Sequence, residues 1–556
     1  MAHVVTQPCC NDASCVAVCP VDCIRPRPDE PGYARAELLH IDPATCIDCG
    51  ACIEECPVDA IVPDTDLTPL DAPFLEINAA YFVDSPIAGT APAPSVPAPA
   101  LGSGPLRVAI VGSGPSACYA AEELLAHRDL DLAITMFERL PTPLGLVRYG
   151  VAPDHQKTKA VAQAFGRTLN RKELSLELNV EVGVHISEEE LLDFHHAVVY
   201  ATGAARGREL GIPGEDLPGV HPASDFVAWY NGHPDHAAHR FDFSAERAVI
   251  VGNGNVALDI ARILVSDPAT LARTDIADHA LEALSQSRIR EVVIAGRRDP
   301  AAAACTVPEL LGLGRIPGVD IVVGRGGTGD GMGEVERGDY RTRLKTRMIA
   351  DFAAGSTGSA DKRIRLEFLR SPQAVHGQGR VESIDLAHNE PIGDGSGAVR
   401  ATGEVDRLEC GLVLTAVGYR PAPMAGVPLR ADGGAVAHDL GRVVGADGAP
   451  VPGRYVTGWA KRGPSGVIGT NKPCSAESMA SLLADFAAGA LSAPTRSLDE
   501  LEALLAQRQP LRIGKQGWKA IDAAERRNGR AGRRPRVKFV DTQEMLGAAG
   551  ALAANL

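Results

Sequence analysis

The 556-residue sequence has no long hydrophobic run and few aromatic residues, which make up 4% of the chain. Because a membrane-spanning helix needs roughly 18 or more consecutive apolar residues, we expect no membrane span. The N-terminus also lacks the basic segment and apolar core of a signal peptide. These absences predict a cytoplasmic protein.

Cysteine is scarce after residue 105, where only Cys118, Cys305, Cys410 and Cys474 occur, all isolated. Thiol–disulfide reductases need a Cys-x-x-Cys pair beside the flavin, so that enzyme class is excluded. The other nine of the 13 cysteines lie within residues 9–56. In a reducing compartment, such clustering indicates metal or redox centres rather than structural disulfides.

Positive charge is rare at the N-terminus and concentrated near the C-terminus. Residues 1–85 contain 15 Asp or Glu residues and three Arg, whereas residues 508–538 contain 11 Lys or Arg and two acidic residues. The basic segment lacks interleaved aromatic residues and a recognisable DNA-binding motif, and the whole chain carries a net charge of -15. We therefore expect no nucleic-acid partner and interpret the segment as a solvated or interdomain surface.

The strongest metal-binding signal is Cys46-x2-Cys49-x2-Cys52-x3-Cys56-Pro57. Three closely spaced thiolates can hold three corners of an iron–sulfur cluster, and the fourth cysteine of this pattern binds the other cluster of a two-cluster ferredoxin. Structural zinc sites usually pair two short cysteine knuckles instead. The spacing therefore predicts iron–sulfur clusters rather than zinc.

The pattern repeats 37 residues earlier, with Asp12 where a cysteine is expected. Crossed ligation predicts one [4Fe-4S] cluster and a second cluster with only three cysteine ligands. The first cluster would be held by Cys19, Cys46, Cys49 and Cys52, and the second by Cys9, Cys15 and Cys56. Three ligands suit [3Fe-4S], whereas [4Fe-4S] would need Asp12 or Cys10 as the fourth. Cys23 is interpreted as small apolar packing beside a cluster.

Residues 1–84 resemble the bacterial two-cluster ferredoxins, which implies a small α+β iron–sulfur domain. Seven-iron members of that family have a longer gap between their first two ligands, so both cluster types stay open. Residues 85–105 are rich in Pro, Ala and Gly and predict a linker. Such a linker could reach about 65 Å as polyproline II, and it would keep the iron–sulfur domain at high effective concentration near its neighbour.

A first nucleotide-binding motif follows the linker. Residues 108–111 predict a buried strand, and Gly112-Ser-Gly114-Pro-Ser116-Ala117 predicts a tight turn into a helix. Such a loop places a pyrophosphate on unpaired N–H groups at the helix N-terminus. Glu138, one βαβ unit later, can accept a hydrogen bond from a ribose hydroxyl, which suits FAD.

A second motif, Gly252-Asn-Gly254-Asn-Val-Ala257, again follows a buried strand. The later strand at 291–296 ends in Arg297 and Arg298 instead of an acid. Two guanidinium groups suit a 2′-phosphate, so this site predicts NADPH rather than NADH. Adjacent flavin and nicotinamide sites imply hydride transfer between the two rings.

Residues 106–556 resemble the adrenodoxin reductase type of ferredoxin–NADP reductase, and the whole chain resembles the ferredoxin-fused reductases of actinobacteria. The matching stretches are 112–117, 143–155, 201–203, 252–259, 297–309, 415–419 and 458–471. The fold implied is α/β, with two Rossmann-like dinucleotide-binding domains beside the ferredoxin-like domain. One departure is Asp299-Pro-Ala-Ala-Ala-Ala304, where relatives place bulkier residues.

The resemblance implies roles at matching positions. FAD contacts would come from Gly112, Gly114, Ser116, Ala117, Glu138, Leu146, Val182, Trp459, Gly466, Val467 and Ile468. NADPH contacts would come from Arg208, Asn253, Gly254, Asn255, Val256, Arg297, Arg298, Glu309 and Gly466. A polar catalytic set near the nicotinamide would consist of His155, Asp259 and Glu309.

Chain order predicts how these motifs are divided among domains. Residues 106–210 and 453–556 would form the FAD-binding domain, because Gly458 and Trp459 return to the flavin. Residues 211–452 would form the NADPH-binding domain inserted between them. The Gly- and Asp-rich stretch 320–405 predicts strands and loops within this insert.

The leading functional prediction is an NADPH:ferredoxin oxidoreductase whose partners are NADPH and a ferredoxin or another small one-electron acceptor protein. A basic helix after His155 could guide an acidic ferredoxin or could be a solvated face; its basic residues are Lys157, Lys159, Arg167, Arg171 and Lys172. The alternative is a flavin and iron–sulfur subunit that oxidises NADPH within a larger synthase. A redox-sensing binding protein is disfavoured, because the two nucleotide sites have opposite ribose chemistry.

Overall fold

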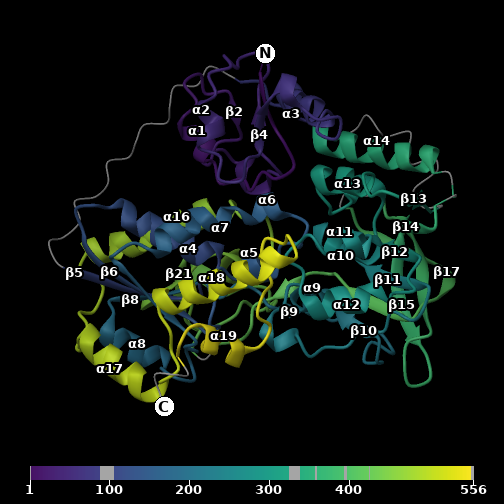
Figure 1. The fold of residues 1–556 in the computed structure, drawn as a ribbon. Helices are drawn as coiled ribbons and strands as arrows, with labels where there is room; N and C mark the ends of the chain where they lie inside the picture. Colours follow the sequence, from purple (N-terminus) through teal and green to yellow (C-terminus); the bar gives the residue numbers. More distant parts are fainter. Residues whose placement is uncertain are drawn as a thin grey trace.

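The computed structural model describes residues 2–87, 105–324, 338–356, 358, 360–393, 397–424 and 426–551. An N-terminal module lies across the top of two larger α/β units in Figure 1. This arrangement confirms the predicted fold class. Among the described residues, no helix is both long and apolar enough to cross a membrane.

The N-terminal module contains two small antiparallel sheets and three α-helices. β1 (His3–Val5) pairs with β4 (Ile61–Pro63), and β2 (Ile24–Arg25) pairs with β3 (His40–Ile41). Each cysteine run contains one short helix, α1 (Ser14–Ala17) or α2 (Ala51–Glu54), and each helix follows a left-handed residue. The internal sequence repeat is therefore also a structural repeat. α3 (Pro73–Asp84) closes the module.

The unit with the first glycine motif is built on a seven-stranded sheet of order β20-β21-β22-β8-β5-β6-β7. The five strands from β22 to β7 are parallel, as expected of apolar runs covered on both faces. The strands are β5 (Pro105–Val111), β6 (Asp131–Glu138), β7 (Leu174–Leu178), β8 (Ala197–Tyr200), β20 (His438–Asp439), β21 (Arg442–Val444) and β22 (Pro450–Val456). The helices are α4 (Pro115–Ala126), α5 (Leu146–Tyr149), α6 (Gln156–Lys159), α7 (Val161–Leu169), α8 (Glu188–Phe194), α15 (Trp459–Arg462), α16 (Asn471–Ala487), α17 (Leu498–Arg508), α18 (Lys515–Ala531) and α19 (Thr542–Ala548).

The unit with the second glycine motif is built on a parallel six-stranded sheet of order β10-β18-β11-β12-β14-β13. Its strands are β10 (Val220–Pro222), β11 (Arg247–Val251), β12 (Glu291–Ala295), β13 (Val319–Val323), β14 (Lys362–Glu367) and β18 (Leu412–Thr415). An antiparallel sheet adds β15 (Arg370–His376), β16 (Ser383–Pro391) and β17 (Val399–Glu409). The α-helices are α9 (Ala223–Tyr230), α10 (Asn255–Val265), α11 (Pro268–Leu271), α12 (Asp278–Ser285), α13 (Val307–Leu313) and α14 (Tyr340–Gly355).

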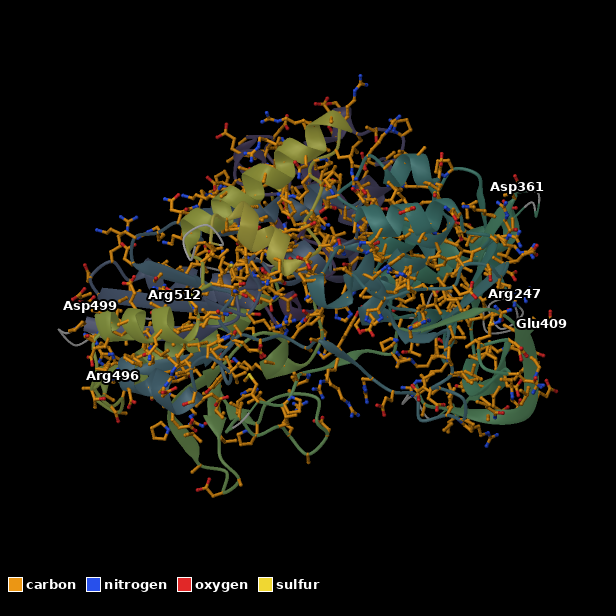
Figure 2. The ribbon with its side chains drawn as sticks, turned by 60° about the horizontal axis from the view of Figure 1, so that its bottom comes forward. Arg247, Asp361, Glu409, Arg496, Asp499 and Arg512 are labelled. Carbon is orange, nitrogen blue, oxygen red and sulfur yellow. The ribbon has the colours of Figure 1, made fainter. Side chains whose placement is uncertain are left out.

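A two-stranded ribbon joins the two large units, where β9 (Arg206–Gly207) pairs with β19 (Tyr419–Arg420). The basic C-terminal segment also contacts both units. Arg512 pairs with Glu177 at 2.8 Å in the first unit, and Lys538 pairs with Asp275 at 2.9 Å in the second. These contacts agree with an interdomain role for this segment. In Figure 2, the labelled Arg512 lies at the left, on the first unit, and the labelled Arg247 and Glu409 lie at the right, on the second unit.

Two features of the insert differ from the sequence-based expectation. Strands β20 and β21 precede residue 453 but belong to the first unit's sheet, so that sheet resumes earlier than the predicted boundary. The stretch 320–405, predicted as strands and loops, also contains the sixteen-residue helix α14. Asp339 caps this helix by accepting the N–H of Thr342 at 2.9 Å, and buried Tyr340, Leu344 and Ile349 anchor it. Tertiary packing of this apolar side outweighs the loop-like composition.

The N-terminal module is docked directly on both large units. Residues 88–104, most of the predicted linker, lie outside the described residues. On the second unit, Val307 donates its N–H to Glu37 at 2.7 Å, and the Tyr340 hydroxyl lies 2.9 Å from His40 Nε2. On the first unit, the Gly469 N–H donates to the Cys10 carbonyl at 2.7 Å. The module therefore occupies a defined position instead of being held by its linker alone.

Candidate active site and iron–sulfur sites

Both nucleotide motifs form loops that only glycine can occupy. Gly112 has φ +101°, and a Cβ there would lie 2.6 Å from the Ala201 carbonyl oxygen. Gly252 has φ +113°, and a Cβ there would lie 2.3 Å from the Ala416 carbonyl oxygen. Because α4 and α10 begin directly after these loops, their first N–H groups lack intrahelical partners and suit a pyrophosphate.

Glu138 ends β6 beside the first loop, and two hydrogen bonds fix its carboxylate. The Ser113 hydroxyl donates to Oε2 at 2.6 Å, and the Leu140 N–H donates to Oε1 at 3.1 Å. Burial raises the pKa of Glu138, and these donors oppose that rise. The carboxylate is thus positioned at the strand end where a ribose hydroxyl would lie.

The C-terminal segment returns to this loop through Asn471, the first residue of α16. Asn471 Oδ1 lies 3.2 Å from the Ser116 hydroxyl, and its Nδ2 donates to the Ile468 carbonyl at 2.8 Å. Trp459 stacks on Tyr419 at 6.0 Å. Gly466 has φ +79°, and its neighbour Val467 donates its N–H to the Thr470 hydroxyl at 3.1 Å.

The remaining predicted FAD contacts lie around the same loop. A Cβ on Gly145 would come within 3.0 Å of the Gly114 Cα, so α5, which begins with the half-exposed Leu146, starts against the loop. Val182 lies two residues after Val180, whose N–H donates to the Glu138 carbonyl at 2.9 Å. Ala117 is fully buried in α4. The structure thus gathers the predicted FAD residues from five separate stretches.

At the second loop, two asparagine side chains accept backbone hydrogen bonds from Ala304 and Thr306, at the end of the alanine-rich segment. Asn253 Oδ1 accepts the Ala304 N–H at 3.3 Å, and Asn255 Oδ1 accepts the Thr306 N–H at 2.8 Å. Asn253 Nδ2 is buried and has no hydrogen-bond partner in the described part of the chain, and a Cβ on Gly296 would lie 2.4 Å from it. An unpaired buried donor beside the loop fits a nucleotide oxygen. Gly254 and Val256 flank Asn255 at the start of α10.

Arg297 and Arg298 directly follow β12. Hydrogen bonds hold their backbone carbonyls, and their guanidinium groups remain available to bind a phosphate. Asn389 donates to the Arg297 carbonyl at 3.0 Å, and the Leu369 N–H donates to the Arg298 carbonyl at 3.0 Å. Within the described residues, neither guanidinium forms an ion pair. The exposed Arg208 follows β9 and bonds the Gly418 carbonyl through its N–H at 3.0 Å. These side chains could contact a phosphate.

The structure brings His155, Asp259 and Glu309 together, with one polar atom of each within 4.8 Å of the others. His155 Nδ1 lies 3.8 Å from Glu309 Oε1. Burial raises the pKa of Glu309, and the charge of Asp259 acts in the same direction. The three residues come from a loop, from α10 and from α13, so only the tertiary fold assembles them.

Arg262 provides the countercharge for this group, and the sequence-based reasoning assigned it no role. Its guanidinium contacts Asp154 at 2.6 Å, Asp259 at 2.6 Å and Glu309 at 3.4 Å. A signal was present in the sequence, because Arg262 lies three residues after Asp259 on one helix and the two therefore share a face. The buried guanidinium fixes the carboxylates that surround the predicted nicotinamide position.

A cavity in the N-terminal module is lined by the four cysteines predicted for the first cluster and by Cys23. Its sulfur-bearing residues are Cys19, Cys23, Cys46, Cys49 and Cys52. Cys23 Sγ lies 3.4 Å from Cys19 Sγ, so this residue packs directly beside a predicted ligand. A thiol-lined cavity, with the ligands of both sequence repeats combined, fits an iron–sulfur cluster.

The second predicted cluster site lies next to the first unit. Burial raises the pKa of the Cys9 thiol to about 12, and the pKa values of Cys10 and Cys15 are raised well above normal for the same reason. Iron would provide the positive charge that thiolates need in such surroundings. The Asp12 carboxylate accepts the hydroxyl and the N–H of Ser14, so it is already engaged. Cys56 Sγ accepts the Ala60 N–H at 3.2 Å.

The basic helix predicted to guide a ferredoxin is partly committed to other contacts. The side chain of Lys159 is only 9% exposed and pairs with Asp275 at 2.8 Å, so the prediction is wrong for this residue. Arg171 pairs with Glu173 at 3.2 Å, whereas Lys157, Arg167 and Lys172 are exposed. In addition, the Thr158 hydroxyl contacts the Pro8 carbonyl of the N-terminal module at 3.4 Å. The chain's own module therefore covers part of this surface.

Comparisons with known proteins agree with this geometry. Residues 106–293 match the family model "Pyridine nucleotide-disulphide oxidoreductase", and residues 39–62 match "4Fe-4S binding domain". The chain is 49% identical to the "Probable ferredoxin/ferredoxin--NADP reductase" of Mycobacterium tuberculosis, over 99% of this chain and 95% of that protein. A similar protein from Mycobacterium leprae is 46% identical, over 99% of this chain and 98% of the relative.

Among solved structures, Mycobacterium tuberculosis FprA in complex with NADPH is 43% identical and superposes with a TM-score of 0.76. The match covers 80% of this chain and all of that chain. The part of the present chain that a single FprA chain does not account for includes the iron–sulfur module. The identity over nearly the full length, together with the two matched domain types, shows that this chain belongs to the ferredoxin/ferredoxin–NADP reductase family.

Proposed function

We propose that this chain oxidises NADPH and delivers electrons to iron–sulfur centres, both its own and that of a separate ferredoxin. The observation that carries the proposal is the contrast between the two nucleotide sites. A carboxylate, Glu138, lies at the end of β6, whereas Arg297 and Arg298, which form no ion pair within the described residues, follow β12. FAD, when bound, accepts a hydride from NADPH and can pass electrons on one at a time. The names of the close relatives support this activity. We also propose a cytoplasmic location, where free clustered thiols persist.

His155, Asp259 and Glu309 are proposed to act at the nicotinamide. Hydride transfer depends on ring alignment, and polar atoms 3.8 Å apart on His155 and Glu309 can orient a carboxamide or hold the flavin proton. Arg262 is a positioning residue, because its guanidinium contacts the carboxylates of Asp259 and Glu309 and holds them in place. FAD would be held by the Gly112 loop, Glu138 and the 459–468 segment.

The proposed test is anaerobic stopped-flow mixing with NADPH, with flavin and iron–sulfur absorbance followed separately. We expect flavin reduction first and cluster reduction afterwards, with NADH far slower. A separate ferredoxin should then be reduced without any further protein. Flavin reduction without transfer to ferredoxin would instead support a subunit of a larger synthase.

Arg297→Ala combined with Arg298→Ala should abolish the preference for NADPH over NADH. The two guanidiniums are partly exposed, so we expect a loss of about 10- to 100-fold in the ratio of kcat/KM values. The ratio is measured with ferricyanide as acceptor. Arg400→Ala, an exposed arginine on β17, is the matched control and should leave the ratio unchanged. An unchanged ratio in the double variant would refute the role of the arginine pair.

The cluster held by Cys9, Cys15 and Cys56 is proposed to be [3Fe-4S], because Ser14 engages the Asp12 carboxylate. Oxidised protein prepared anaerobically should show the EPR signal of a three-iron cluster. Asp12→Cys, which completes the repeat, should replace that signal with a four-iron centre. If the natural protein shows no three-iron signal, the site holds [4Fe-4S] and Cys10 becomes the candidate fourth ligand.

A further inference from the structure

Two histidines and an aspartate form a compact group outside the nucleotide and iron–sulfur sites. Asp225 lies in the first turn of α9, His236 ends the short 3-10 helix η3 (Pro234–His236), and His239 follows in the next turn. One oxygen of Asp225 and one ring nitrogen of each histidine all lie within 4.8 Å of one another. The side chains of Asp225 and His236 are 25% and 26% exposed, so solvent can reach the group.

The atoms in this group are close but not hydrogen-bonded. His236 Nδ1 lies 3.8 Å from Asp225 Oδ1, which is too long for a hydrogen bond. The same Nδ1 is buried and has no hydrogen-bond partner among the residues that the structure describes. Leaving a buried ring nitrogen unpaired is costly, and a cation between the two atoms would satisfy both.

The two rings lie next to each other on a turn that a backbone hydrogen bond fixes. His236 and His239 stack with centroids 5.2 Å apart and an interplanar angle of 15°. The His239 N–H donates to the His236 carbonyl at 3.1 Å, which fixes the turn between them. Tetrahedral zinc lies about 2.0–2.1 Å from such ligands, which places ligand atoms roughly 3.3 Å apart. Reaching that spacing requires the two partly exposed rings to rotate out of the stack, so that a nitrogen of each faces the Asp225 carboxylate.

The charge around this group also favours a cation. In the second cluster of potential ligands, which has one histidine (His155) and two carboxylates (Asp259 and Glu309), Arg262 already contacts both carboxylates. Asp225 differs, because no arginine or lysine forms an ion pair with it within the described part of the chain. Within the described residues, its Oδ1 accepts a hydrogen bond only from the Ser224 hydroxyl, at 3.1 Å, and is otherwise approached by His236.

We propose that Asp225, His236 and His239 bind one zinc ion, with a water molecule in the fourth position. Two imidazoles and one carboxylate with an open position form a common zinc ligand set. The site lies on η3, whose Asp235 pairs with Arg139 of the first unit at 2.6 Å. Zinc would therefore hold η3 against α9. It would also stabilise the ion pair between Asp235 and Arg139, the residue that follows Glu138.

The experiment uses untagged protein loaded with FAD and both clusters, with iron and sulfide content verified. After equilibration with zinc sulfate and desalting, elemental analysis should give one zinc per chain. Asp225→Asn, His236→Gln and His239→Gln should each weaken zinc binding by about 100-fold or more, since even outer-shell changes cost 10- to 100-fold. Zinc should also raise the Tm of the natural protein but not of these variants.

His233→Asn is the matched control. His233 belongs to the same row of histidines, but its Nδ1 is used to accept the Asp235 N–H at 3.2 Å, and asparagine can keep that capping bond. The control should therefore bind zinc normally. Crystals grown with zinc should show an anomalous peak between Asp225, His236 and His239. Zinc content unaffected by the three substitutions, or an anomalous peak elsewhere, would overturn the proposal.

Discussion

Gly469→Ala should separate the iron–sulfur module from the flavin-binding unit. A Cβ at this position would lie 1.8 Å from the Asn11 carbonyl oxygen and 2.0 Å from its carbon. Both are backbone atoms of the docked module, so no side-chain rotation relieves the clash. The neighbouring hydrogen bond, from the Gly469 N–H to the Cys10 carbonyl at 2.7 Å, would also be lost. The backbone of Gly469 itself has no positive φ, so alanine adds no local strain.

Electron transfer from the flavin to a cluster becomes slower as the two centres move apart, and loss of this docking would increase their separation. We therefore expect reduction of the iron–sulfur centres to slow by about 10-fold or more, because the module would then be held only by its linker, while NADPH still reduces the flavin at its normal rate. Stopped-flow absorbance measures both. Gly166→Ala, on α7 with nothing within 4 Å of an added Cβ, is the matched control. If Gly469→Ala left cluster reduction unchanged, the observed docking would not be the state that transfers electrons.

Asp275→Asn should cause a large loss of stability. The buried Asp275 carboxylate pairs with Lys159 at 2.8 Å and with Lys538 at 2.9 Å, and the two lysine side chains are only 9% and 1% exposed. Asparagine keeps the shape but leaves two buried ammonium groups without a countercharge. Breaking a buried ion pair from one side costs about 3–5 kcal/mol. Urea unfolding should show this loss, whereas Asp432→Asn, in an exposed pair with Arg430, should change little.

The Asp275→Asn variant should also recover stability at high pH. Burial lowers the pKa of Lys538, and the charges of Lys159 and Arg148 act in the same direction, whereas Asp275 opposes them. A lysine whose pKa is lower in the folded state binds fewer protons there than in the unfolded chain, so stability rises with pH toward about 10.4. The deficit should therefore shrink between pH 7 and pH 10. A deficit independent of pH would show that the lost hydrogen bonds, not the charges, are responsible.

Local sequence patterns were sufficient to place the two glycine loops and the residues at the strand ends beside them. The glycine loops, Glu138 and the arginine pair lie at strand ends within single βαβ units, where spacing dictates position. The cysteine repeat likewise predicted that Cys19 would lie with Cys46, Cys49 and Cys52, and all four line one cavity. These features depend on residues that are near in sequence or related by an internal repeat.

Features that depend on distant partners could not be predicted in this way. Lys159 looked like a solvent-exposed charge because its partner, Asp275, lies 116 residues away. The docking of the N-terminal module depends on contacts such as that of Tyr340 with His40, 300 residues apart. Arg262 was visible on the same helix face as Asp259, but its contact with Asp154 required the fold.

The pairing of β9 with β19 brings the two ends of the second unit together. Gly207 lies opposite Tyr419 and Arg206 opposite Arg420, so the chain enters and leaves the second unit at adjacent points. A domain whose ends lie side by side can be accommodated within a loop of a host domain without disturbing the host's strands. The second unit, which contains the proposed NADPH site, could therefore be replaced by another domain while the strands of the first unit stayed intact.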